Sequence, residues 1–160
     1  MKLFKLFAAS LMACAALLFT SCEKGVTNTG DFTGNLYGVW QLDTKTVARE
    51  TIKDTDFGGE HFYLAIVPLG AFAKKGALSA WDFKIDVDPS FCTYNNVKHQ
   101  IYFKDALALS HGITEVMYLK GTYDVLELSK DKLVISQTTG NKTTTYSFHK
   151  LFQQEEIESN

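Results

Sequence analysis

Residues 119–150 read LKGTYDVLELSKDKLVISQTTGNKTTTYSFHK. This stretch predicts three strands, at 119–128, 133–137 and 143–150, because apolar and β-branched residues recur in runs separated by a few turn-forming polar residues. Turns this short can join only antiparallel neighbours. The stretch therefore favours an antiparallel meander at the end of the domain.

Further strands are expected upstream of this meander. Residues 81–88, WDFKIDVD, alternate apolar and charged side chains without a fault, as a strand with one buried face does. Four other segments contain enough aromatic and β-branched residues to favour strands. They are residues 36–42, 61–67, 97–103 and 113–118. Segments 69–80 and 105–110 fit no strand pattern, and each is expected to form a short helix or a loop.

About eight antiparallel strands in sequence predict an all-β protein. They can close into an up-and-down barrel, which leaves no exposed edge; the alternative is a β-sandwich. The predicted domain covers residues 36–151, and residues 152–160 form an acidic tail. A barrel of this size has an interior that holds either one small ligand or side chains alone.

The beginning of the chain predicts export from the cytoplasm. Lys2 and Lys5 precede a nearly continuous apolar run, Leu6 to Phe19, which has the length of a signal-peptide core and is too short to span a bilayer. Residues 1–21 are therefore expected to be a signal peptide. The polar residues 22–35 are expected to be a flexible tether.

The end of this run resembles a bacterial lipobox, Phe19-Thr20-Ser21-Cys22. The resemblance implies that the Cys22 thiol is linked to a diacylglycerol, that the signal is cut before Cys22, and that the new amine is acylated. Each buried methylene of an acyl chain contributes about 0.8 kcal/mol, so several chains make a durable membrane anchor. We therefore expect a lipid-anchored protein of the cell envelope, at the outer membrane.

The charge balance argues against a nucleic-acid partner, and the cysteine content argues against an internal disulfide. The chain has 16 basic and 18 acidic residues, and two of its lysines leave with the signal, so nucleic acid is not an expected partner. Of the three cysteines, Cys14 lies in the signal and Cys22 takes the lipid. Cys92 is then alone, so no internal disulfide is expected.

A second resemblance concerns the domain itself. Gly38-Val39-Trp40 looks like the Gly-x-Trp signature of lipocalins and related calycin barrels, and the closing strands are similar to those of small lipocalin-like bacterial lipoproteins. The resemblance implies that Trp40 packs across a closed end of the barrel. In lipocalins an arginine caps this Trp; here the only arginine is Arg49, and Lys150 could take its place.

The barrel interior is expected to bind a small hydrophobic molecule. The alternation patterns point a set of aromatic side chains inward: Trp40, Phe62, Trp81, Phe83, Phe103, Tyr123, Tyr146 and Phe148. Of these, Phe62, Phe83, Phe103 and Tyr123 are candidate ligand contacts. Val97, Ile101 and Phe103 share a strand face with His99, so His99 is expected to be an inward polar group, either bonded within the core or orienting a ligand.

The segment at residues 69–80, LGAFAKKGALSA, is a candidate lid over this interior. Gly70 and Gly76 bracket an apolar patch around Phe72, which is a further candidate ligand contact.

Nothing in the sequence predicts catalysis or a cofactor. The four histidines show no metal-binding spacing, and Asp82, Asp86 and Asp88 share what we expect to be a solvated strand face. Cys92 has no basic neighbour that would activate it. We therefore expect a non-enzymatic protein that binds a small hydrophobic ligand. The alternative is an interaction module with a solid barrel, which contacts an envelope protein or a glycan.

Overall fold

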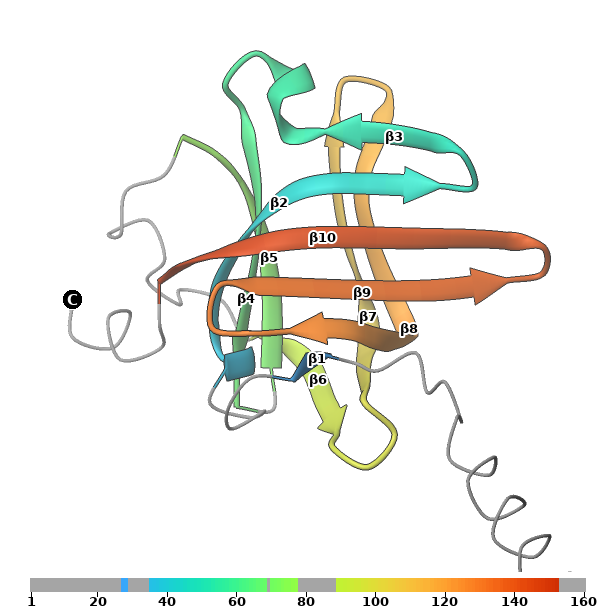
Figure 1. Ribbon diagram of the computed structural model, residues 1–160. Helices are drawn as coiled ribbons and strands as arrows, with labels where there is room; N and C mark the ends of the chain where they lie inside the picture. Colours follow the sequence, from blue (N-terminus) through green and yellow to red (C-terminus); the bar gives the residue numbers. More distant parts are fainter. Residues whose placement is uncertain (1–26, 29–34, 69, 78–88, 153–160) are drawn as a thin grey trace, which may run out of the picture.

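Antiparallel strands dominate the structure, a computed structural model that describes residues 27–28, 35–68, 70–77 and 89–152 (Figure 1). The elements in chain order are β1 (Thr27–Asn28), β2 (Gly38–Val47), β3 (Glu50–Lys53), the 3-10 helix η1 (Asp54–Phe57), β4 (His61–Val67), β5 (Gly70–Gly76), β6 (Ser90–Asn95), β7 (Gln100–His111), β8 (Thr114–Leu128), β9 (Lys132–Thr139) and β10 (Lys142–Phe152).

Eight of these strands close into a barrel. They pair in the order β8-β7-β6-β5-β4-β2-β10-β9, and β9 pairs back with β8. Each of the eight lies beside the barrel strands next to it in sequence, and the first, β2, pairs with the last, β10. The predicted all-β, up-and-down, eight-stranded barrel is therefore confirmed, and the β-sandwich alternative is excluded.

The other two strands lie outside the closed path. β3 pairs only with the second half of β2, whereas β1 runs parallel to the end of β8, with Thr27 opposite Glu127 and Asn28 opposite Leu128. β1 falls within the segment predicted to be a flexible tether, so at least these two residues are docked on the barrel.

The strands that form the barrel are not all those predicted. The two segments 113–118 and 119–128 are one continuous strand, β8. Residues 105–110, expected to be a helix or a loop, belong to the long strand β7. Residues 70–76, expected to be part of a lid, helix or loop, form β5, and the predicted strand at 81–88 lies outside the described residues.

Gly121 allows β8 to serve as one long strand. Its φ is +80°, a conformation that residues with a Cβ rarely adopt. The amide of Gln137 on β9 packs over it, and Nε2 donates hydrogen bonds to the carbonyls of Lys120 and Thr122, each at 3.0 Å. A side chain of the neighbouring strand β9 thus bonds to the backbone on both sides of Gly121.

The interior is filled by inward side chains from all around the barrel. The predicted inward aromatics that the structure describes are at most 2% exposed, and they are Trp40, Phe62, Phe103, Tyr123, Tyr146 and Phe148. They form one hydrophobic core with aliphatic residues such as Leu64 and Ile135. Trp81 and Phe83, also predicted to face inward, lie outside the described residues.

Trp40 is fully buried near the start of β2. The indole Nε1 donates a hydrogen bond to the Leu36 carbonyl at 2.8 Å. Lys150, directly opposite on β10, places its ammonium 4.4 Å from the centroid of the Trp40 ring, within the range of a cation–π interaction. The predicted role of Lys150 as the cap of this Trp is confirmed.

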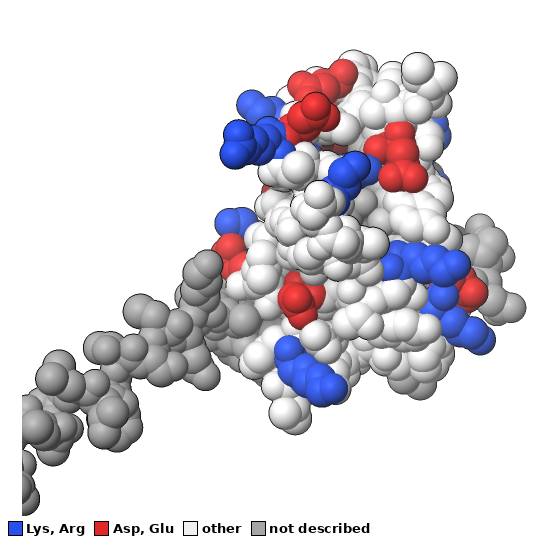
Figure 2. All heavy atoms as spheres, turned by 90° about the vertical axis from the view of Figure 1, so that its right-hand side faces the viewer, with Lys and Arg blue, Asp and Glu red and all other residues white. Residues whose placement is uncertain are grey.

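On the face shown in Figure 2, acidic and basic side chains lie close to one another.

Replacing Trp40 by alanine is expected to lower the free energy of unfolding by about 3–5 kcal/mol, because it removes a fully buried aromatic side chain. The measurement is chemical denaturation followed by circular dichroism. Tyr102→Ala is the control, since the Tyr102 side chain is 40% exposed and its loss is expected to cost far less. If the two variants lost equal amounts of unfolding free energy, Trp40 would not be a core residue of the barrel.

Candidate functional site

A row of four aromatic rings in contact with one another lies in the hydrophobic core. We call it the aromatic plug: Phe103, Tyr123, Tyr146 and Phe148, whose successive ring centroids lie 5.8, 6.2 and 6.2 Å apart. Edge-to-face and stacked rings at these separations attract one another beyond simple burial. The plug therefore forms part of the hydrophobic core.

The two tyrosines of the plug anchor it to β8. Tyr123 and Tyr146 both donate hydrogen bonds to the Tyr118 carbonyl, at 2.9 and 3.1 Å. Burial raises the pKa of Tyr123 to about 12, and it also raises the pKa of Tyr146. Both hydroxyls therefore stay protonated in neutral solution and hold the rings in place.

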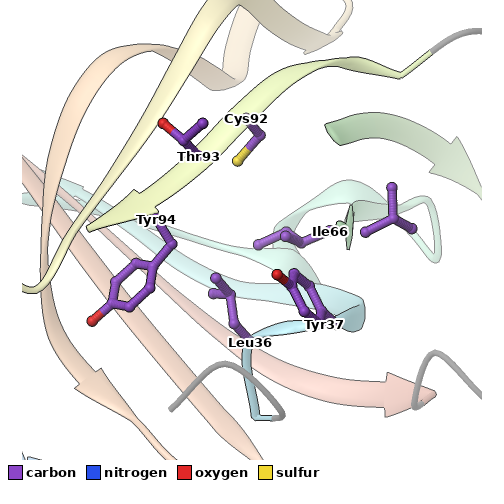
Figure 3. A pocket seen from close by; sticks show the side chains of 7 residues that line it. Leu36, Tyr37, Ile66, Cys92, Thr93 and Tyr94 are labelled. Carbon is purple, nitrogen blue, oxygen red and sulfur yellow. The ribbon is translucent and has the colours of Figure 1, made fainter. Parts of the chain in front are cut away.

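An apolar hollow lies beside the start of β2, and we call it the Cys92 pocket (Figure 3). Its volume is about 120 Å³. Three parts of the chain form its walls: the residues just before β2, the end of β4, and β6. The lining residues are Leu36, Tyr37, Ile66, Val67, Cys92, Thr93 and Tyr94.

The size of the Cys92 pocket limits what it can hold. An apolar cavity of about 150 Å³ accepts one benzene molecule, so a hollow of about 120 Å³ accepts one small apolar group. A ligand larger than this must leave the rest of its body outside the pocket.

The thiol of Cys92 is a lining group of low reactivity. The Cys92 side chain is buried, and burial raises its pKa to about 12. The thiolate is the reactive form of cysteine, and here it is strongly disfavoured. Cys92 therefore acts as a small apolar side chain.

Three of the predicted ligand contacts belong to the packed core. Phe62, Phe103 and Tyr123 face the interior as predicted, with at most 2% exposure, but none of them lines the Cys92 pocket. The fourth aromatic, Phe83, lies outside the described residues.

The assignment of Phe72 to a lid is wrong. Residues 70–76 pair with β4 along their whole length, so their backbone is held in the sheet. Phe72 packs on the outer face of the barrel against Val39, Tyr63 and Ala65. Gly70 is required by close approach rather than by flexibility, because a Cβ there would lie 2.7 Å from the ring of Pro89.

The assignment of His99 to an inward strand position is also wrong. β7 begins at Gln100, His99 lies in the preceding turn with a φ of +51°, and Val97 is 90% exposed. The side chain of Asn95 accepts hydrogen bonds from the backbone N–H groups of Val97 and Lys98, which forms the turn. His99 is half-buried, and its Nδ1 lies 3.2 Å from the hydroxyl of Tyr94. Tyr94 in turn lines the Cys92 pocket.

Three other histidines pair with carboxylates on the outside of the barrel. His61 contacts Asp54, His111 lies 2.8 Å from Glu60, and His149 lies 2.5 Å from Asp43. The hydrogen bond from His111 lowers the pKa of Glu60. Among the described residues, no group of three or more His, Cys, Asp or Glu side chains is arranged to hold a metal ion.

Lys45 faces the interior, which the sequence did not indicate. Thr44 lies opposite Ser147 and Leu42 opposite Phe148, so Asp43 is an extra residue in β2. This β-bulge shifts the alternation by one position, and Lys45 points inward beside Tyr146. The Lys45 side chain lines a second hollow of about 210 Å³ near the end of β2.

Comparison of the chain with protein families, curated proteins and solved structures finds no match. Within the described part of the chain, no helix has the length and hydrophobicity needed to cross a membrane. The fold itself defines an eight-stranded antiparallel barrel, an architecture compatible with binding a small ligand.

In the folded protein, the Cys92 thiol is expected to resist alkylation by iodoacetamide at neutral and mildly alkaline pH, because its raised pKa keeps it protonated. Mass spectrometry of a Cys22→Ser variant, before and after denaturation, measures this directly. Modification of the folded protein at the rate of a free thiol would contradict the burial of Cys92.

Proposed function

We propose that this protein is a lipid-anchored barrel of the cell envelope, which holds a small apolar group of its ligand in the Cys92 pocket. The observation that carries the proposal is the pocket itself, a largely apolar hollow of about 120 Å³ beside the start of β2. Most ligand sites are concave and mainly apolar, with a few polar groups at their margin.

The chemistry of the lining fits this role. Leu36, Ile66 and Cys92 supply apolar surface, and Tyr37, Thr93 and Tyr94 supply hydroxyl groups at the margin. An aromatic ring or a short branched chain suits such a lining. A sterol or a long-chain lipid would enter by one end only, because it is larger than the pocket.

The lipobox-like sequence at residues 19–22 supports the anchor. A thioether-linked lipid at Cys22 would keep the barrel at a membrane surface, for which we propose the outer membrane. The parallel pairing of β1 with β8 attaches residues 27–28 to the barrel. The barrel would therefore lie only a few residues of chain away from the lipid.

A second function, an interaction module with a solid barrel, is favoured by two observations. The interior aromatics are tightly packed, and two large hydrophobic side chains are exposed on the outer face of β6 and β7: Phe91 at 44% and Tyr102 at 40%. Exposed aromatics of this kind are frequent anchors of protein interfaces. Under this alternative the partner is an envelope protein or a glycan.

Cys22→Ser is expected to abolish membrane anchoring, because serine offers no thiol for the transfer of diacylglycerol. Partitioning into detergent, combined with the mass of the mature N-terminus, measures the effect. A Cys92→Ser variant is the matched control and should stay in the detergent phase. A Cys22→Ser protein that has lost residues 1–21 and still partitions like the wild type would refute the lipid anchor.

Cys92→Met is expected to abolish binding of fluorobenzene, because the longer side chain occupies the pocket. The measurement is fluorine NMR of the probe titrated with protein. Thr122→Met, at an exposed position on β8, is the control and should bind like the wild type. If the wild type binds no fluorobenzene, the pocket proposal fails; loss of partner capture in Phe91→Ser would then support the interaction module.

A further inference from the structure

Lys45 is a nearly fully buried cation at the end of the barrel remote from Trp40. Its side chain is only 7% exposed, and its ammonium lies 5.8 Å from the centroid of the Tyr146 ring. Removing a charge from water is costly unless the charge is paired and hydrogen-bonded. The way in which Lys45 is paired therefore indicates what this end of the barrel can accept.

Among the residues that the structure describes, one exposed side chain, that of Glu115, pairs with the charge of Lys45. Its ammonium donates to the Glu115 carbonyl at 2.9 Å and to Glu115 Oε1 at 3.3 Å. The Glu115 side chain is 57% exposed, and ion pairs with exposed partners contribute little. A lysine ammonium has three N–H donors, and both of these contacts go to Glu115.

The hollow in front of Lys45 is large enough for a small molecule. Its volume of about 210 Å³ exceeds the roughly 150 Å³ that accepts benzene. Lys142 and Thr144 of β10 and Gln137 of β9 also line it. Two lysines face one glutamate in this lining, so an anion is the favoured occupant.

We propose that this hollow, the Lys45 pocket, binds a small organic carboxylate, such as one attached to an aromatic ring or a short chain. The ligand carboxylate displaces the Glu115 carboxylate from the Lys45 ammonium and takes over its contact with the charge. The apolar body of the ligand packs against Tyr146 and Val47, which also line the hollow.

Two features favour a carboxylate over an inorganic anion. The group that now contacts the ammonium is a carboxylate oxygen, so the site already accommodates this chemistry. The hollow also has more room than an inorganic ion needs, and part of its wall is aromatic and aliphatic. The Lys45 pocket is separate from the Cys92 pocket, since none of its lining residues is shared.

The test is titration of the full-length protein in detergent with benzoate, followed by calorimetry. Lys45→Met, which keeps the side-chain length but removes the charge, is expected to weaken binding by about tenfold or more, as loss of a charged hydrogen bond does. Glu115→Gln is expected to strengthen binding several-fold, because it removes the competing carboxylate. Lys104→Met, at an exposed position on β7, is the control and should leave binding unchanged.

The outcomes are distinguishable from those for the Cys92 pocket. Wild-type benzoate binding that Cys92→Met leaves unchanged supports a separate site. The proposal is overturned if the wild type binds no benzoate, if Lys45→Met binds it as well as the wild type, or if inorganic phosphate competes equally well. If Lys45→Met does not fold, the exposed Glu115→Gln decides: weaker or unchanged benzoate binding in that variant overturns the proposal.

Discussion

The contact between the Lys150 ammonium and the Trp40 indole holds one end of this barrel together. It joins β10 to β2, the last barrel strand to the first. The same ammonium donates to the Asn35 and Tyr37 carbonyls, which fixes the residues before β2. Burial lowers the pKa of Lys150 to about 8, opposed by nearby Asp131. Because Leu36 and Tyr37 form one wall of the Cys92 pocket, the pocket depends on this contact for its shape.

The fold was predictable where local chemistry determines it. The meander at residues 119–150 has short polar turns and regular alternation, and β9 and β10 lie where these signals placed them. The predicted secondary structure was wrong where contacts with residues outside the segment determine the local conformation. Gly70 belongs to a strand that pairs with Phe91 of β6, and the turn before β7 depends on the side chain of Asn95.

The candidate sites were less predictable than the fold. Alternation correctly indicated that Phe103, Tyr123 and Tyr146 face inward, but it cannot indicate whether inward rings line a cavity or pack on one another. That depends on contacts between strands far apart in sequence. Lys45 was missed because a single extra residue, Asp43, reverses the alternation of β2. Cys92 was missed as a lining residue because a lone cysteine carries no pattern.

The strands of the barrel are unequally joined. Within the described residues, β5 and β6 pair only through Gly70 with Phe91 and Ala71 with Ser90, whereas β4 and β5 pair along their full length. Local opening is least costly where the fewest backbone hydrogen bonds must break. Cys92 follows directly after this seam on β6, and Val67 pairs with Gly70 at the start of β5. The part of the described barrel wall with the least backbone pairing therefore runs beside the Cys92 pocket.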